Sequence, residues 1–203
     1  LTVERFKGLI PIENTWIVTS ADYKDIIREQ LPEIPVENIL LEPCRRNTAP
    51  CICYVSWKIK KRNPKANIVV APSDHIIADV KGFQEAIADT MEFSAETDAI
   101  VTLGIRPTHA ETGYGYIKAD LTYSSSRKKN IFRVDAFTEK PSREVAEEYI
   151  KQNQYLWNSG IFIWKTSSIL AAIERHLPDM HTLFASAADK YGTEAEAEAI
   201  ADI

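Results

Sequence analysis

Residues 67–75 read NIVVAPSDH. The apolar run NIVVA is followed by a proline, a serine, an aspartate and a histidine. A continuous apolar run without polar alternation is typical of a strand that is buried on both faces of a sheet. In open α/β sheets, ligands bind beyond the carboxyl ends of the strands, which is the position of Asp74. The segment therefore predicts a buried strand over residues 67–71 and places a carboxylate at a candidate ligand site.

Outward from this segment, short β-rich runs alternate with longer helical stretches, which is typical of a layered α/β sheet. In the first half we expect strands over residues 15–19, 38–41 and 99–105, and helices over 21–31, 50–61 and a long stretch that repeats Phe83, Ile87 and Met91 every four residues. In the second half we expect strands over residues 114–119, 131–138 and 160–165, and helices over 142–151, 167–176 and the Ala- and Glu-rich tail 185–203, which we place at the surface. A length of 203 residues suits one domain of this class.

Charge and composition argue against several classes of protein. The net charge of −5 disfavours a nucleic-acid-binding protein, because binding to a phosphate backbone needs a basic face. No apolar run reaches the length that a membrane span requires. The three cysteines, Cys44, Cys51 and Cys53, are odd in number and lack the spacing of a zinc site, so we expect reduced, packed thiols in a cytoplasmic protein.

Asp74 is the first candidate for chemistry. A carboxylate at the end of a buried strand suits a hard cation such as Mg²⁺, which also binds substrate phosphates. The alternative is that Asp74 caps the following turn, as aspartate often does. This motif alone does not decide between the two.

The second candidate is the segment EPCRRNTAP at residues 42–50, which again lies between a strand and a helix. Arg45 and Arg46 offer forked donors for a phosphate, and a helix N-terminus adds exposed N–H groups. Glu42 and Asn47 carry the acceptors and donors that read the edge of a base. A polar loop with Thr48 as the helix N-cap is the alternative. The pair of arginines favours ligand binding.

A glycine pair surrounds an aromatic residue in the segment TGYGY at residues 112–116. Gly113 and Gly115 allow the backbone to approach a ligand closely, and Tyr114 has the flat apolar face that lines a sugar site. Glycines at the start of a strand are equally common in ordinary turns, so this motif is weak alone.

Opposite charges are adjacent in FTEKP at residues 137–141, and a polar turn precedes an apolar strand in WNSGIF at residues 157–162. Along a strand, Glu139 and Lys140 point to opposite faces, so we expect them not to pair with each other. Glu139 then suits a sugar hydroxyl, Lys140 a phosphate and Asn158 a second sugar hydroxyl. The alternative for the charges is that both are solvated.

The segments EPCRRNTAP, APSDHII, TLGIRPTHAETGYGYI, FTEKP and WNSGIF together resemble, in order and spacing, the mannose-1-phosphate guanylyltransferases, which are sugar-1-phosphate nucleotidyltransferases. The resemblance covers residues 1–184. It implies a Rossmann-like α/β nucleotidyltransferase core with a mixed, mostly parallel sheet flanked by helices, in a single incomplete domain over residues 1–203.

The same resemblance implies roles for individual residues. It assigns the guanosine site to Glu42, Arg45, Arg46, Asn47 and Thr48. It assigns a catalytic Mg²⁺ to Asp74 and the sugar phosphate to Lys140, the second catalytic residue. It assigns the mannose site to Gly113, Tyr114, Gly115, Glu139 and Asn158.

The implied activity is transfer of GMP from GTP to mannose 1-phosphate, giving GDP-mannose and pyrophosphate, in a cytoplasmic enzyme with no nucleic-acid or membrane partner. The oligomeric state is open, with a homodimer as one candidate. The family's Gly-rich loop is expected before Leu1 and its second metal-binding aspartate after Ile203, so we expect the 203-residue chain alone to be an impaired catalyst.

Three other functions compete with this one. The first is a nucleotidyltransferase for another base or sugar 1-phosphate. The second is a non-catalytic regulatory homologue that binds a sugar nucleotide. The third is a structural α/β interaction module.

Overall fold

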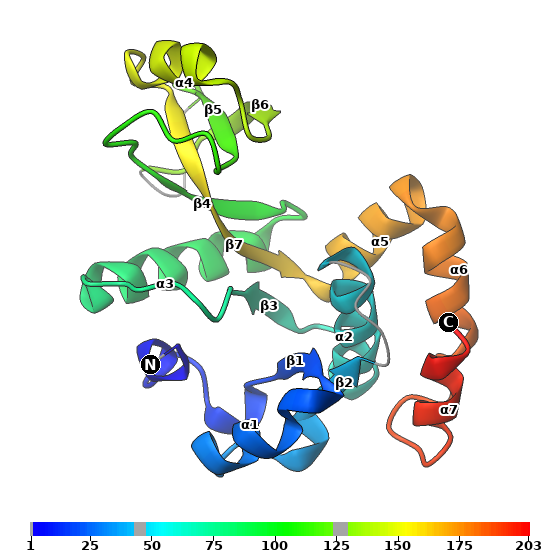
Figure 1. Cartoon of the computed structure of the whole chain (residues 1–203). Coiled ribbons are helices and arrows are strands. Elements are labelled where there is room, and N and C mark those ends of the chain that lie inside the picture. The colour runs from blue at the N-terminus through cyan, green and yellow to red at the C-terminus, as the bar shows by residue number, and fades with distance from the viewer. Residues whose placement is uncertain (1, 43–47, 124–129) are drawn as a thin grey trace.

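The computed structural model describes residues 2–42, 48–123 and 130–203, with helices on both faces of a five-stranded sheet (Figure 1). The strands are β1 (Ile17–Ser20), β2 (Ile39–Glu42), β3 (Asn67–Val70), β4 (Val101–Ile105), β5 (Tyr116–Asp120), β6 (Arg133–Thr138) and β7 (Tyr155–Lys165). The α-helices are α1 (Lys24–Gln30), α2 (Thr48–Arg62), α3 (Val80–Glu96), α4 (Arg143–Ile150), α5 (Thr166–His176), α6 (Pro178–Ser186) and α7 (Glu196–Ala201). Short 3₁₀ helices are η1 (Val3–Phe6), η2 (Ile12–Asn14), η3 (Ala21–Tyr23) and η4 (Val36–Asn38).

Strand β7 organises the larger sheet. It pairs antiparallel with β3, β4 and β5, and β5 pairs antiparallel with β6. Phe162 and Ile163 each have a partner in β3 and another in β4, so β7 lies between these two strands. Because β3 and β4 both run opposite to β7, they run in the same direction, as the sequence pattern predicts, but β7 separates them.

The mixed α/β class is confirmed, whereas the mostly parallel sheet is not. Among the described strands, only β1 and β2 pair in parallel, and they form a separate two-stranded sheet. The alternation of strands and helices correctly predicts the direction of the early strands. This alternation does not indicate that β7, which comes late in the sequence, enters the sheet in the opposite direction.

The two faces of the sheet have different cores. Ile161 and Ile163 of β7 pack with Phe83 and Ile87 of α3 on one face. Trp164, on the opposite face of β7, packs with residues of α2, α5, α6 and α7. This alternation follows from the two-residue period of a strand. The apolar run of β3 alternates in the same way, since Ile68 joins one core and Val69 the other, which confirms the prediction of a strand covered on both faces.

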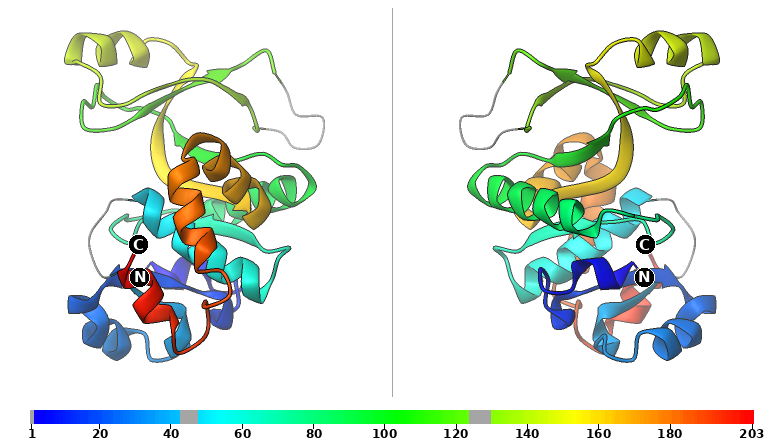
Figure 2. Two further views of the ribbon diagram at one scale, coloured as in Figure 1. Left: turned by 90° about the vertical axis from the view of Figure 1, so that its right-hand side faces the viewer. Right: turned by 90° about the vertical axis from the view of Figure 1, so that its left-hand side faces the viewer.

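A second part of the molecule, the β5–β6 lobe, consists of β5, β6, α4 and the beginning of β7 (Figure 2). It has a small core of its own around Tyr116, Ala146 and Trp157. The strand β7 continues from this lobe into the larger core and ends at α5, so one strand serves both parts.

The tail differs from the prediction of one surface helix over residues 185–203. Helix α6 begins earlier, with Pro178 in its first turn, and a run of turns separates it from the short α7. Ala199 and Ile200 of α7 are buried against the α2 core. The tail therefore closes the apolar core on one side.

A buried carboxylate joins α7 to α2. Glu196, of which 8% is exposed, accepts hydrogen bonds from the Tyr54 hydroxyl (2.6 Å), the Lys58 ammonium (2.7 Å) and the Gly192 N–H (2.6 Å). Burial raises the pKa of the Glu196 carboxyl, but the bonds from Lys58, Tyr54 and Gly192 together outweigh burial and bring the pKa below its ordinary value of 4.5.

We expect Glu196→Gln to lower the free energy of unfolding at pH 7 by about 1–3 kcal/mol, because an amide cannot satisfy three donors. Since the folded-state pKa is depressed, this stabilisation is fully present above pH 4.5 and is lost as the pH falls through the lowered pKa. Urea unfolding of both proteins at several pH values measures the difference. The exposed Glu198→Gln on the same helix is the control, and a difference that grows on acidification would contradict the assignment.

Within the described ranges, no helix combines the length and the apolar character that crossing a membrane requires.

Candidate active site

Asp74 lies in the loop that follows β3. Its side chain is exposed, and it makes no hydrogen bond or ion pair with another described residue. The nearby helix α3 is capped by Asp79, whose carboxylate accepts a 2.9 Å hydrogen bond from the Gly82 N–H. The capping alternative for Asp74 is therefore wrong, and its carboxylate is available to a ligand.

The backbone of β7 passes directly against this loop. Gly160 has a positive φ of 70°, and a Cβ added to it would lie 3.2 Å from Cγ of Pro72. A residue with a side chain would be strained at this φ and would press on Pro72. The glycine thus allows β7 to lie beside the residues that lead to Asp74.

Asn158, two residues before Gly160, is held by its side-chain oxygen. The Gly160 N–H donates to Oδ1 of Asn158 (3.2 Å), and the Thr102 hydroxyl shares its single proton between this Oδ1 (3.1 Å) and the Ile161 carbonyl (3.0 Å). The amide nitrogen of this side chain donates to no described residue. The structure therefore fixes the oxygen and leaves the nitrogen free to donate to a ligand.

The predicted sugar residues are brought together around Gly115. A Cβ on Gly115 would lie 2.7 Å from Oε2 of Glu139, so this carboxylate packs against bare backbone. The Gly115 carbonyl accepts from the Asn158 N–H (2.8 Å), and the Tyr114 carbonyl accepts from the Lys140 N–H (3.2 Å). Segments that are far apart in the sequence are thereby joined by backbone hydrogen bonds.

Lys140 has an unusual backbone conformation. Its φ of 45° lies in the left-handed region, which residues other than glycine rarely adopt and which costs energy. Its ammonium group pairs with no described carboxylate, Glu139 included. The two residues follow β6 in a bend, so the alternation along a strand, from which we predicted that they do not pair, does not apply to them. A strained cation without a described partner, at the edge of the predicted sugar site, is available to an anion.

Sequence reasoning did not assign Glu111, although it holds the glycine loop. Its Oε1 accepts from the Gly113 N–H (2.9 Å), and the Tyr116 hydroxyl bonds to both its N–H and its carbonyl. The bond from Gly113 and a weaker one from His109 lower the pKa of the Glu111 carboxyl. An acidic residue two positions before a glycine is typical of such a turn and could have indicated Glu111. The pattern is not specific, because it occurs in many turns without a function.

An aromatic wall stands behind the same loop. The rings of Tyr114 and His109 meet Trp157 edge-on, at centroid distances of 5.3 Å and 5.0 Å. Trp157 is buried, whereas Tyr114 is half exposed, at 50%. Tyr114 is thus held by Trp157 while half of its surface stays exposed, and an exposed aromatic ring suits a wall of a sugar site.

The predicted guanosine residues are described in part. Glu42 ends β2 and Thr48 begins α2, while Arg45, Arg46 and Asn47 lie outside the described residues. Burial raises the pKa of the Glu42 carboxyl. Burial, together with the charge of Glu42, raises the pKa of the Cys51 thiol to about 11, so the thiol stays protonated and unreactive at neutral pH.

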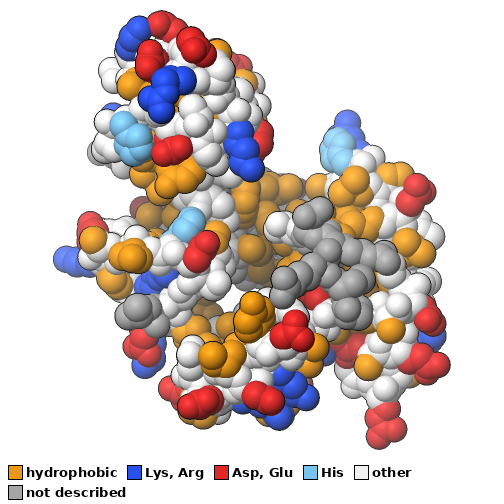
Figure 3. Space-filling model, viewed as in Figure 1, with side chains coloured by type: hydrophobic (Ala, Val, Ile, Leu, Met, Phe, Trp, Pro, Cys, Tyr) orange, Lys and Arg blue, Asp and Glu red, His pale blue; other side chains and the backbone are white. Residues whose placement is uncertain are grey.

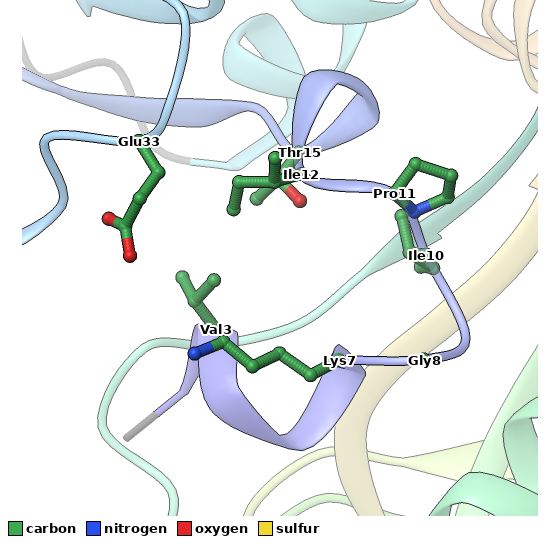
Figure 4. Close-up of a pocket in the computed structure, with 8 residues that line it drawn as sticks. All are labelled: Val3, Lys7, Gly8, Ile10, Pro11, Ile12, Thr15 and Glu33. Atoms are coloured by element: carbon green, nitrogen blue, oxygen red, sulfur yellow. The ribbon is translucent and has the colours of Figure 1, made fainter.

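The face shown in Figure 3 is hollowed between the β5–β6 lobe and the part formed by α5 and α6. A separate cavity of about 300 Å³ lies at the N-terminal segment and is lined mainly by apolar side chains, with Lys7 and Glu33 at its rim (Figure 4). Lys7 pairs with Glu4 at 2.7 Å. None of the predicted site residues lines this cavity, so it does not belong to the candidate site.

The whole chain is similar to known proteins. A family model described as nucleotidyl transferase matches residues 4–199. Mannose-1-phosphate guanylyltransferase of Escherichia coli K12 is 34% identical over 183 residues, which cover 88% of this chain and 38% of that protein. Mannose-1-phosphate guanylyltransferase 2 of Escherichia coli O157:H7 is 38% identical over 189 residues, covering 90% and 39%.

The fold has a solved counterpart. The crystal structure of mannose-1-phosphate geranyltransferase from Thermus thermophilus matches with a TM-score of 0.84 and 32% identity, covering 100% of this chain and 56% of that chain. By comparison, the chain spans 38% and 39% of the length of the two Escherichia coli proteins, which is less than half of each.

Proposed function

Because the chain belongs to the nucleotidyl transferase family, we propose that its full-length gene product transfers GMP from GTP to mannose 1-phosphate. The relatives named mannose-1-phosphate guanylyltransferase support this substrate pair. The observation that carries the proposal is the convergence of Gly115, Glu139, Lys140 and Asn158 in the β5–β6 lobe, which includes the start of the strand whose Gly160 lies against Pro72, two residues before Asp74. We propose a cytoplasmic enzyme and leave a homodimer as a prediction.

In the proposed reaction, a phosphate oxygen of mannose 1-phosphate attacks the α-phosphorus of GTP. The new bond forms as the bond from the α-phosphorus to the oxygen of the β-phosphate breaks, and pyrophosphate leaves. Such phosphoryl transfer depends mainly on positioning and on charge compensation. Glu139 and the Asn158 amide hold sugar hydroxyls, and Lys140 orients the attacking phosphate.

The residues present fit a Mg²⁺ ion that is shared with the substrate. Among the described residues no cluster of three or more metal-ligating side chains exists, which argues against a metal held by these residues alone. Mg²⁺ commonly binds one or two carboxylates and completes its shell with water and substrate phosphates. Asp74, exposed and without a partner among the described residues, would hold such an ion, which would offset negative charge on the phosphate oxygens.

Base selectivity tests the proposal. We expect GTP to bind the full-length gene product about 10-fold to 100-fold more tightly than ATP, because a site built for one base leaves buried polar groups unpaired with another. Calorimetry measures both affinities, and a pyrophosphate-release assay with mannose 1-phosphate, glucose 1-phosphate and each nucleotide identifies the preferred pair.

Each competing function gives a different result in these measurements. Turnover with another pair identifies another nucleotidyltransferase, and binding of GDP-mannose without turnover identifies a regulatory homologue. Absence of nucleotide binding identifies an interaction module. Equal affinities for GTP and ATP would overturn the guanosine assignment.

A further inference from the structure

Side chains of the N-terminal segment form hydrogen bonds with the backbone on both sides of Asp74. The Thr2 hydroxyl donates a 2.7 Å hydrogen bond to the carbonyl of Ser73. Nη2 of Arg5 donates a 2.6 Å hydrogen bond to the carbonyl of His75 and a 2.9 Å bond to Thr2. The two carbonyls that flank Asp74 are thus held by two side chains that also bond to each other.

Arg5 is an energetically unfavourable residue to place here. Only 5% of it is exposed, its Nη2 finds only neutral acceptors, and its Nη1 is buried with no hydrogen-bond partner among the described residues. A buried cation without an anionic partner lowers stability, and replacement by an apolar residue of similar volume is often neutral or stabilising. Stability of the fold therefore does not explain this guanidinium, whereas control of the Asp74 loop does.

The N-terminal segment is in turn attached to helix α3. Nε2 of Gln84, in α3, donates to the carbonyls of Arg5 (2.9 Å) and Lys7 (3.2 Å). Phe6, next to Arg5, packs edge-on against Phe83 of the same helix at 5.4 Å. Because α3 covers one face of β3 and β7, the position of Arg5 is fixed relative to the strand that leads to Asp74.

We propose that Arg5, together with Thr2, is a positioning residue for Asp74. By holding the carbonyls of Ser73 and His75, it fixes where the Asp74 carboxylate lies and so where a divalent cation bound to it meets the substrate phosphates. This inference rests on the proposed function only in the role that it gives to Asp74. Partners that orient a metal ligand typically change metal affinity or activity about 10-fold to 100-fold when removed.

The test uses Arg5→Met, which keeps much of the volume and removes the donors, and Arg5→Lys, which keeps the charge. Thr2→Val removes only the hydroxyl at nearly constant shape. Arg28→Met, at an exposed position of α1, is the matched control. All variants are made in the full-length gene product.

Three measurements are made on each variant. Hydrogen exchange of peptides that cover residues 71–79 reports the loop directly, without substrate or metal. Turnover and Mn²⁺ binding in the presence of GTP, the latter by electron paramagnetic resonance, report the cation.

For Arg5→Met we expect faster exchange in residues 71–79 with unchanged protection of β7, and Mn²⁺ affinity and kcat lower by about tenfold. The KM for mannose 1-phosphate is expected to stay within about twofold, because the sugar residues lie elsewhere. Thr2→Val should show a smaller change of the same kind, and Arg5→Lys a partial recovery.

Unchanged exchange in residues 71–79 would overturn the inference, as would an equal loss of protection in β7, which marks a general structural role. Failure of the proposed function gives a different pattern. In that case wild-type protein forms no GDP-mannose, or Asp74→Asn retains full turnover, whatever the exchange of the Arg5 variants shows.

Discussion

Asp74→Asn is expected to lower the kcat of the full-length gene product by about a thousandfold, which corresponds to roughly 4 kcal/mol of lost transition-state stabilisation. The amide keeps the size of the side chain and removes the charge that a Mg²⁺ ion requires. Because the Asp74 side chain is exposed and makes no hydrogen bond or ion pair with another described residue, we expect the melting temperature to be unchanged. GDP-mannose formation at several Mg²⁺ concentrations measures the effect.

Asp79→Asn is the matched control for this substitution. The same chemical change is made five residues further along, at the cap of α3, where asparagine is as good a cap as aspartate. We expect its turnover and stability to remain close to those of the wild type. Near-normal turnover of Asp74→Asn at saturating Mg²⁺ would remove Asp74 from the reaction.

Gly115→Ala is expected to raise the KM for mannose 1-phosphate about a hundredfold, which corresponds to roughly 3 kcal/mol, the upper range for loss of a hydrogen bond to a charged group such as the Glu139 carboxylate. The added Cβ would lie 2.7 Å from Oε2 of Glu139 and 3.1 Å from the Phe137 ring. Both neighbours belong to β6 or its end, so the strand or the carboxylate must move away from the predicted sugar. The affinity for GTP should stay unchanged, since none of these residues belongs to the predicted guanosine site.

Gly113→Ala is the control for the glycine loop. Its Cβ would meet only Oε1 of Glu111, at 3.3 Å, which is the flexible end of a side chain. We expect at most about a few-fold change in KM, because such a contact is relieved by a small rotation. Steady-state kinetics with each substrate varied, together with urea unfolding of both variants, separates a blocked sugar site from a damaged fold. Equal KM values for the two variants would contradict the role of Gly115.

Prediction from the sequence succeeds where a residue acts through its neighbours in the chain. The apolar run of β3 and the four-residue repeat of Phe83 and Ile87 in α3 identify both elements and their buried faces. Strand β7 was expected over residues 160–165 and begins at Tyr155. The polar segment around Asn158 and Gly160 is typical of a turn, but in the structure it belongs to β7, where Asn158 pairs with Gly104 of β4.

In the candidate site, too, the sequence predicts local features and misses contacts between distant residues. The sequence identifies Asp74, Glu139, Lys140 and Asn158 as chemistry-bearing residues, and the resemblance to a family groups them; their roles stay predictions. The supporting contacts of Arg5 with His75 and of Thr102 with Asn158 join residues 70 and 56 positions apart. No local pattern indicates such pairs, because an arginine or a threonine in a helix or strand matches many environments.

Strand β7 also limits how this protein can be divided or recombined. Its first three residues pair with β5 of the β5–β6 lobe, and its last four pair with β3 at the other end of the same five-stranded sheet. Strand β7 belongs to both parts of the molecule. The β5–β6 lobe therefore cannot be exchanged as a unit, in evolution or by engineering, because no linker separates it from the rest of the chain. A chimaera with a related enzyme must take β7 whole and must bring both surfaces that pack on it. Changes of sugar preference are therefore expected to accumulate as substitutions in the loops around Gly115 and Glu139, and not by replacement of the lobe.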